Sequence, residues 1–215
     1  MAVRPIFVVS LDSRYCIREN VEFEFFSGFS DKQKKRCINS LHQSYLATTP
    51  GKKILEISSK SEDELGVRLS AFNLMMKSEN GKEFSVESAF QAGKVFELGG
   101  PYLDLLYVPS KVAKRDERLK NSGKVIAFEF DRKRFETEPK TLFYNWLYIN
   151  TLHLHKELAR PLLDYDAFTD IEFNPQKSIN CQAEAAAIYV SLSKQGLLEQ
   201  ALQDKERFKE IVYRV

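Results

Sequence analysis

One segment constrains the fold more than any other: residues 141–158, with the sequence TLFYNWLYINTLHLHKEL. Drawn as a helix, it carries aromatic and aliphatic side chains over much of its circumference, and a helix of that kind is buried inside a protein. A chain of 215 residues with 16 Phe and 9 Tyr can surround such a helix and fill a core without disulfides. The sequence therefore predicts one domain with this helix inside it.

The other segments predict short strands and several further helices. Strands are expected at residues 4–12, 21–26, 52–59 and 124–131, with a hairpin over 73–86 that turns at Asn80-Gly81. Helices are expected at residues 29–47, 85–99, 110–124 and 180–196, followed by a last helix at the C-terminus. Because strands and helices do not alternate regularly, the predicted fold class is α+β, a single mostly helical domain with small strands.

The charged residues are nearly balanced, with 32 basic and 30 acidic side chains and a net charge of +2. This balance neither requires nor excludes a nucleic-acid partner, so any basic patch must be local. The densest basic run is Lys32, Lys34, Lys35 and Arg36, in the helix predicted at residues 29–47. Two interpretations are open: a solvated helix face, or a contact with a phosphate backbone.

Cysteine and histidine spacing argues against metal chemistry. These residues are Cys16, Cys37, Cys181, His42, His153 and His155. None of them has the spacing of a zinc or iron–sulfur site, and the last two histidines would face different sides of a helix. We therefore expect no metal and no cofactor. Free thiols, and an N-terminal apolar run too short for a signal peptide or a membrane span, predict a cytoplasmic protein without membrane association.

Three functional side chains follow the predicted hairpin at helical spacing. Glu87, Gln91 and Lys94, in SVESAFQAGK, fall within about 60° of one another on a helix. One interpretation is a solvent-facing stripe in which Glu87 pairs with Gln91. The other is the wall of a polar pocket, where a carboxylate and an amine serve proton transfer or charge stabilisation.

Several pieces of sequence around this segment follow one another in a recognisable order. Leu69-Ser70-Ala71-Phe72-Asn73 precedes the predicted hairpin, and VESAFQAGK follows it. Next come SKVAKRDERL, then FYNWLY with Trp146, then HKELARPLLDYDAFTDIEFNP with Ile171-Glu172. In this order the pieces resemble the NADAR family, over about residues 65–195.

A closer similarity is to the NADAR proteins encoded beside DarT-type DNA ADP-ribosyltransferase toxins, in which phrases such as GGPYLDLL, AKRDERLKNSG and AFTDIEFNPQKSINCQA recur. The resemblance implies one NADAR-like domain over residues 1–215, in which 1–60 form an N-terminal extension packed on a 65–195 core. It also implies an antitoxin that removes ADP-ribose from guanine bases of DNA by hydrolysing the N-glycosidic bond. The implied partners are ADP-ribosylated single-stranded DNA and the cognate DarT-type toxin.

The chain departs from the general family near its C-terminal motif. The family has an Asp followed by a Trp-Gly pair, whereas this chain has NPQKSINCQ. The candidates for the missing Asp are Asp170, Asn174, Ser178 and Asn180. An Asn is also common at the position of Ala71, and Asn73 can serve in its place.

The implied reaction suggests roles for the polar residues. Cleavage of a ribose C1–N bond builds positive charge on the sugar, which a nearby carboxylate stabilises while it activates water. Glu87 is the first candidate for this catalytic role. Lys94 would protonate the leaving base, hold a phosphate, or form a Schiff base with the opened ribose, and Gln91 would orient water or a sugar hydroxyl. Asp170, the third catalytic candidate, lies in a predicted loop together with Glu172. Two interpretations are open for these carboxylates: both are ordinary surface acids, or one of them holds ribose hydroxyls or shares the acid–base work.

Binding of ADP-ribose would need further contacts. The candidate substrate-binding residues are Ser70, Phe72, Asn73, Gln91, Trp146, Glu172, Asn174 and Asn180. The aromatic rings of Phe72, Trp146 and Tyr144 can stack on a base, although simple core packing is the favoured alternative for each.

Two other functions remain open alongside the hydrolase. Without the Asp and Trp-Gly motif, the chain can be a non-catalytic module that binds ADP-ribose or sequesters the toxin. It can also be an N-glycosidase that acts on small ribosylated intermediates of the riboflavin pathway. Lys111, Lys114 and Arg115 can hold phosphates or remain solvated, so they do not discriminate between these functions.

Overall fold

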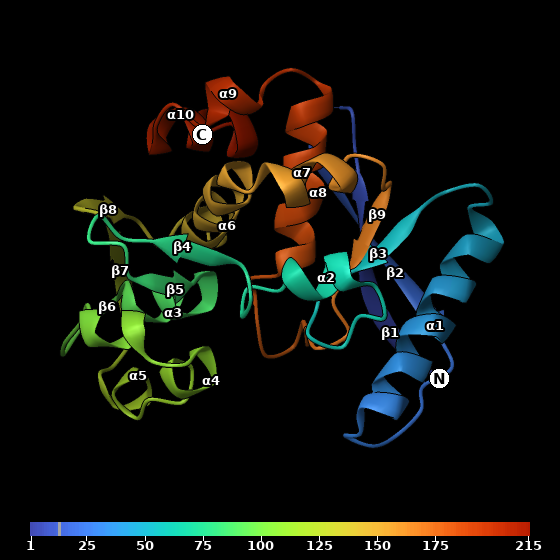
Figure 1. Cartoon of the computed structure of the whole chain (residues 1–215), viewed down its shortest axis with the longest axis horizontal. Helices are drawn as coiled ribbons and strands as arrows, with labels where there is room; N and C mark the ends of the chain where they lie inside the picture. Colours follow the sequence, from blue (N-terminus) through green and yellow to red (C-terminus); the bar gives the residue numbers. More distant parts are fainter. Residues whose placement is uncertain (13) are drawn as a thin grey trace.

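A four-stranded sheet brings together distant segments of the chain in the computed structural model, which describes residues 1–12 and 14–215 (Figure 1). Its strands are β1 (Ala2–Val9), β2 (Cys16–Phe23), β3 (Ile54–Glu56) and β9 (Ala167–Thr169). The strand order is β2-β1-β9-β3, where β1 is antiparallel to β2 and β9, and β3 is parallel to β9. The N-terminal strands thus share one sheet with a strand from the last third of the chain.

Each face of this sheet is covered by a helix. Neighbouring strand residues point to opposite faces, so Ile6 packs with the buried stripe of α1 (Asp31–Thr48), while Phe7 packs into the main core with α8 (Gln182–Lys194). Ala167 and Phe168 divide in the same way on β9. The sheet therefore lies between α1 and α8 (Figure 1).

The apolar segment over residues 141–158 forms the buried helix α6 (Leu142–Leu154). Most of its residues are buried, as the all-round apolar pattern predicts. It ends four residues before the predicted boundary, because the ring of His155 leaves the helix and its Nε2 lies 2.7 Å from the carbonyl oxygen of Met75. The chain continues as a separate helix, α7 (Lys156–Leu162).

The remaining strands are short. The predicted hairpin consists of β4 (Met75–Lys77) and β5 (Glu83–Ser85), and Gly81 has a φ of +78° in its turn, as expected for Asn-Gly. A second small sheet has the order β6-β7-β8, with β6 (Lys94–Phe96), β7 (Val125–Phe130) and β8 (Lys133–Phe135).

Two helices differ from the sequence-based expectation. The helix expected over residues 85–99 is only α3 (Val86–Ala92), and Lys94 begins β6 instead. The charged helix expected over 110–124 is divided into α4 (Ser110–Ala113) and α5 (Arg118–Asn121). The break follows from Asp116, whose carboxylate accepts hydrogen bonds from the backbone and side chain of Arg118 and so favours a turn there.

The other helical elements complete the domain. They are α2 (Glu64–Arg68), η1 (Leu103–Tyr107), α9 (Leu198–Ala201) and α10 (Lys205–Tyr213). Helices make up about 42% of the chain and strands about 19%, which confirms the prediction of a single, mostly helical α+β domain. Within residues 1–12 and 14–215, no helix is both long enough and apolar enough to cross a bilayer.

Candidate active site

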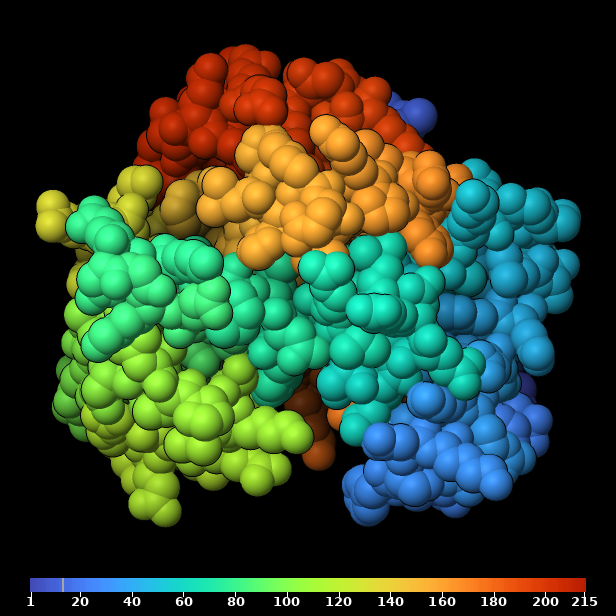
Figure 2. Space-filling view, viewed as in Figure 1, coloured from blue at the N-terminus to red at the C-terminus, as the bar shows by residue number. Residues whose placement is uncertain are grey.

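A cavity of about 1190 Å³ opens between α3, α4 and the connection from β9 to α8. Segments from most of the chain line it, from Ser58 after β3 to Gln182 at the start of α8. Its mouth is the hollow between the blue N-terminal lobe and the yellow-green α4–α5 segment in Figure 2. The volume of this cavity lies slightly above the range of about 300–1,000 Å³ that is typical of small-molecule binding pockets.

Glu87, Gln91 and Lys94 form a hydrogen-bonded row on the wall of this cavity. The ammonium of Lys94 donates to Gln91 Oε1 at 2.7 Å, and Gln91 Nε2 donates to Glu87 Oε1 at 2.9 Å. Glu87 and Gln91 are each only 5% exposed. This geometry excludes the solvent-facing stripe and favours the polar-pocket interpretation.

Local structure at both ends of α3 orients this row. Ser85 caps the helix by accepting the amide N–H of Ser88 at 3.0 Å, and the amide of Glu87 donates to the carbonyl of Ala71 at 2.9 Å. At the other end, the helix ends just before Gly93, whose lack of a Cβ allows a close approach of β7: a Cβ there would lie 2.7 Å from the carbonyl oxygen of Glu129. The chain turns into β6 at this point, and Lys94 reaches back toward Gln91.

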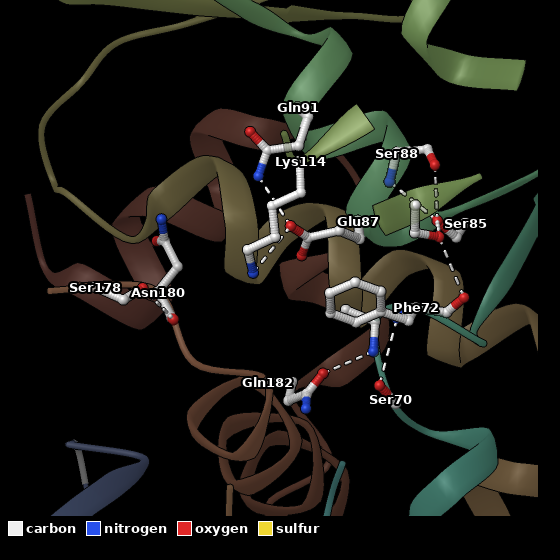
Figure 3. Close-up of polar contacts among 12 residues, drawn as sticks. Ser70, Phe72, Ser85, Glu87, Ser88, Gln91, Lys114, Ser178, Asn180 and Gln182 are labelled. Carbon is white, nitrogen blue, oxygen red and sulfur yellow. Dashed lines mark hydrogen bonds and ion pairs between the residues drawn. The ribbon is translucent and has the colours of Figure 1, made fainter. Parts of the chain in front are cut away.

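The carboxylate of Glu87 has one engaged oxygen and one available oxygen. Besides Gln91, the ammonium of Lys114 lies 3.3 Å from Glu87 Oε1 (Figure 3). Among the residues that the structure describes, no side chain or backbone group donates to Oε2. A carboxylate held through one oxygen can direct the other toward a substrate or a water molecule.

The protonation of Lys94 is altered by its surroundings. Burial lowers the pKa of its amine to about 8, against an ordinary value of 10.5; the Glu87 carboxylate opposes this change and the Lys114 ammonium adds to it. Its Nζ also lies 4.9 Å from the centre of the Phe90 ring. Near neutral pH, about a tenth of this amine is therefore neutral, the form that suits a nucleophile, and the rest is an ammonium, the form that donates a proton.

Two carboxyl groups lie close together on this side of the protein: Asp170, which is half-buried and lines the cavity, and Glu56, which is buried and does not line it. Burial raises the pKa of Asp170 well above its usual range, and the nearby charge of Glu56 raises it further. Glu56 is 2% exposed and holds the residues on either side of Asp170: it accepts the hydroxyl of Thr169 at 2.6 Å and the amide of Ile171 at 2.8 Å. Glu56 thus fixes the backbone that presents Asp170 to the cavity.

A buried histidine extends this arrangement away from the cavity. His42 Nε2, on α1, lies 2.8 Å from the hydroxyl oxygen of Thr169. Because that hydroxyl donates its single proton to Glu56, the imidazole nitrogen is the donor to Thr169. Burial lowers the pKa of His42 to about 4, so the ring is neutral at physiological pH.

Gln182 connects two walls of the cavity. Its Oε1 accepts the amide N–H of Ala71 at 2.7 Å (Figure 3), and its Nε2 donates to the carbonyl of Ile57 at 2.6 Å. Next to it, the Ser70 hydroxyl accepts the amide of Phe72 at 3.4 Å. These contacts hold the segment that bears the Phe72 ring, over which the Lys114 ammonium lies at 5.1 Å from the ring centre.

A family model described as the DarT1-associated NADAR antitoxin matches residues 2–215. The chain belongs to this antitoxin family. A comparison with curated proteins gave no match.

The structure brings together nearly all the residues that the NADAR resemblance identifies. The cavity is lined by Ser70, Phe72, Asn73, Glu87, Gln91, Lys94, Asp170, Glu172, Asn174 and Asn180. Every candidate for the missing family Asp, including Ser178, also lies on its wall. Asn180 Oδ1 is buried without a hydrogen-bond partner among the described residues, so this amide has capacity for a ligand.

Trp146 is the exception and corrects the sequence-based assignment. It does not line the cavity. Its ring packs on Phe135 at a centroid distance of 4.9 Å, and the side chain is 7% exposed. The alternative of core packing therefore describes Trp146, because its side of α6 faces the aromatic core, whereas Tyr144 on the same helix lines the cavity.

Sequence reasoning did not identify Glu56, Gln182 or Phe90. Glu56 lies in a short strand and Gln182 at a helix start, and neither position has a local pattern that sets it apart from ordinary polar residues. Their importance arises from contacts with residues more than 100 positions away, which only the fold creates. In the described part of the chain, no group of three or more His, Cys, Asp or Glu residues has a geometry that can hold a metal ion.

Proposed function

We propose that the protein is an antitoxin enzyme that removes ADP-ribose from guanine bases of DNA by hydrolysing the N-glycosidic bond. The observation that carries the proposal is the position of Glu87. Its carboxylate is buried on the wall of a large cavity, one oxygen is held by Gln91 and Lys114, and the other oxygen is available. Membership of the DarT1-associated family supports the same conclusion, because a DarT-type toxin attaches the group that an antitoxin would remove.

The bond to be broken joins the anomeric carbon of ribose to a base nitrogen. In the proposed reaction, that bond's electron pair leaves with the base, and positive charge develops on the sugar ring. Glu87 stabilises this charge and takes a proton from the attacking water, whose oxygen bonds to the anomeric carbon. The leaving nitrogen receives a proton, so the products are the unmodified base and free ADP-ribose.

Lys94 has three possible chemical roles in this reaction, and its pKa allows an experiment to separate them. If the neutral amine attacks the anomeric carbon, the rate of release rises with pH and levels off above about 8. If the ammonium protonates the base or holds a phosphate, the rate falls above the same pH. Trapping with borohydride then separates the attacking amine from the other two roles, because only a Schiff base is reduced to a stable adduct.

The cavity also offers suitable groups for the rest of ADP-ribose. Two basic side chains at its wall, Lys114 and Arg115, are positioned to neutralise a diphosphate. Phe72 and Tyr144 present aromatic surface for a base. We assign the ribose hydroxyls to the polar residues of the β9–α8 connection, Asp170 and Asn180.

The decisive experiment is incubation of the protein with a guanine-ADP-ribosylated oligonucleotide and mass analysis of both products. Wild-type protein is expected to yield unmodified oligonucleotide and free ADP-ribose. Glu87→Gln is expected to slow release by at least about 100-fold, as for loss of a general base. The matched control is Glu138→Gln, the same chemical change at an exposed position of the cavity rim, which should leave the rate within about twofold.

The same experiment tests the alternatives. Tight binding of ADP-ribose or of the toxin without any release would identify a binding module and overturn the hydrolase. Release from small ribosylated compounds but not from the oligonucleotide would identify a small-molecule N-glycosidase. Unchanged release by Glu87→Gln would exclude Glu87 from the mechanism.

A further inference from the structure

Positive charge is concentrated at the cavity rather than spread over the surface. Among the described residues that line it, eight are basic and four are acidic. Two of those carboxylates, Glu87 and Asp170, lie on the inner walls, whereas the whole chain has a net charge of only +2. ADP-ribose carries two phosphates, so the cavity holds more cations than this group alone can neutralise.

The first turn of α1 borders the mouth of the cavity. Asp31 and Lys34 share one face of this helix with Lys35, since they are three and four residues apart. Two ion pairs attach this face to the cavity wall: Asp31 with Lys60 at 2.6 Å, and Lys34 with Glu172 at 2.8 Å. Lys35 makes no salt bridge within the described chain and remains on the same side.

The opposite side of the mouth is formed by α4. The hydrogen bond from Lys60 lowers the pKa of Asp31, and the charges of Lys35 on α1 and Lys111 on α4 lower it further. Both cations are therefore within electrostatic reach of one carboxylate at the mouth. Figure 2 shows the hollow that separates the two walls, with the orange-brown residues of the β9–α8 connection visible inside it.

An exposed aromatic residue closely precedes the helix that bears Lys34 and Lys35. Phe29 is 97% exposed and directly precedes Ser30, the residue that caps α1. Ile179, on the β9–α8 connection, is 57% exposed and lines the cavity. A single exposed apolar side chain is ordinary, but an aromatic ring next to a row of cations is the arrangement with which proteins bind unpaired nucleic-acid strands.

We propose that Phe29, Lys35, Lys111 and Ile179 form a binding surface, the mouth rim, for the single DNA strand that flanks the modified guanine. This inference rests on the proposed function, which places the guanine inside the cavity. An enzyme that acts on a base must receive it unpaired, so the flanking nucleotides cross the mouth. Their phosphodiesters supply the negative charge that ADP-ribose lacks, and a neighbouring base stacks on Phe29.

The test measures binding of an unmodified, fluorescently labelled ten-nucleotide strand by anisotropy. Lys35→Gln and Lys111→Gln are expected to weaken binding, and each should reduce the slope of log affinity against log salt by about 0.7. Phe29→Ser is expected to weaken binding about tenfold, while Phe29→Trp retains it, because a stacked base needs an aromatic face. Phe29→Leu separates stacking from simple apolar contact and should behave like Phe29→Ser.

Matched controls lie far from the mouth. Lys194 is at the opposite end of α8 from Gln182, about 18 Å along the helix, and Leu154 is 75% exposed at the end of α6. Lys194→Gln and Leu154→Ser are therefore expected to bind the strand like wild type. Calorimetry with free ADP-ribose should give the wild-type affinity for Phe29→Ser and Lys35→Gln, since neither lines the cavity.

The outcomes of this test can be distinguished from those of the proposed function. Rim variants that bind the strand as tightly as wild type, at low salt, would overturn the mouth rim even if the protein releases ADP-ribose. A rim-dependent affinity for the strand without release of ADP-ribose would overturn the hydrolase and leave the rim in place. Rim variants that lose toxin binding but keep strand binding would show that this surface serves the toxin instead, which contradicts the proposal.

Discussion

At the scale of single residues, Lys94 allows a direct measurement of how the cavity changes an ionisable group. Burial lowers its pKa to about 8, and the charge of Lys114 acts in the same direction. We expect NMR of protein labelled with ¹³C-lysine to give a titration midpoint near 8 for Lys94, about two units below the ordinary lysine value. Lys114→Gln should raise this midpoint, because a nearby positive charge is removed and Glu87 loses a competing partner.

Lys194 provides the comparison for this titration, because its side chain is exposed at the end of α8. Its signal should be unaffected by Lys114→Gln. A midpoint for Lys94 above 10 would mean that solvent reaches the amine freely. The row from Lys94 through Gln91 to Glu87 would then be too loosely packed to serve the proposed chemistry.

The raised pKa of Asp170 predicts that Asp170→Asn changes the thermal stability of the protein by an amount that depends on pH. Burial raises its pKa in the folded protein above the ordinary value of 3.8, as does the charge of Glu56. The protonated form of Asp170 therefore stabilises the folded state. This contribution is complete at pH values below the pKa of Asp170 in the unfolded chain, and it is lost as pH rises through the pKa of Asp170 in the folded protein. Asp170→Asn avoids this loss, so we expect its Tm to exceed that of wild type by about 2–4 °C at pH 7 and by less toward pH 4.

Asp104 is the control, because its pKa is shifted in the opposite direction and the Tm difference should have the opposite sign. The hydrogen bond from Arg118 lowers the pKa of Asp104, so its contribution is present above the unfolded pKa and is lost as pH falls through the folded pKa. Asp104→Asn should therefore lower the Tm at pH 7, and the difference should shrink in acid. Thermal melts of both variants between pH 4 and 8 measure the two trends. A pH-independent Tm difference for Asp170→Asn would indicate a solvated carboxyl group.

At the scale of elements, the sequence predicts where helices begin better than where they end. Helix starts have local signals, such as the capping hydroxyls of Ser30 and Ser85, and both helices begin within two residues of the predicted positions. The end of α3 has no such signal, because β6 forms only when Lys94 pairs with Phe128 on β7. Tertiary pairing therefore decides an element that local preference would continue as a helix.

The site was predictable to a similar degree. Side chains that the family motif identifies, such as Glu87, Gln91 and Asp170, meet in the cavity. Trp146 does not, because a motif gives a position on a helix but not the face that turns toward the core. Glu56 and Gln182 carry no motif, and their contacts join segments whose proximity depends on the complete fold.

The close packing at the end of α3 predicts how a methyl group added at Gly93 would affect stability. At Gly93 φ is an ordinary −75°, so alanine adds no backbone strain. Its Cβ would instead lie 2.7 Å from Glu129 O and 3.1 Å from the Phe143 ring, so β6 must shift. We expect Gly93→Ala to lower the free energy of unfolding by about 2–3 kcal/mol and to displace Lys94, as denaturant titration and ADP-ribose affinity would measure.

A substitution at Gly81 distinguishes the cost of steric crowding from the cost of an unfavourable backbone conformation. A Cβ there meets no atom within 4 Å, but its φ is +78°. Gly81→Ala should therefore cost only about 1–2 kcal/mol, from the left-handed conformation, and leave ADP-ribose binding unchanged. Equal costs for the two variants would contradict the role of close approach at Gly93.

At the scale of the whole molecule, the first 60 residues are built into the structure rather than attached to it. Strand β1 lies between β2 and β9, and Phe7 belongs to the main core. The hydroxyl of Ser191 on α8 donates to the carbonyl of Ser10. The same region supplies Glu56, which fixes the backbone on either side of Asp170. Both stability and the cavity therefore depend on this part of the chain.

This dependence predicts the behaviour of a fragment that begins at residue 61. Without β1 and β3, β9 would have no partner strand, and the apolar face of α8 that packs on the sheet would meet water. We expect the fragment to lack a cooperative thermal transition and to lose ADP-ribose binding, although it retains Glu87, Gln91 and Lys94. Adding residues 1–60 as a separate chain should restore both properties in part, because the missing contacts are interfaces rather than covalent features. A fragment that melts cooperatively and binds ADP-ribose by itself would instead identify the N-terminal region as an independent extension, and the strand pairing of β1 with β9 would then contribute little to the fold.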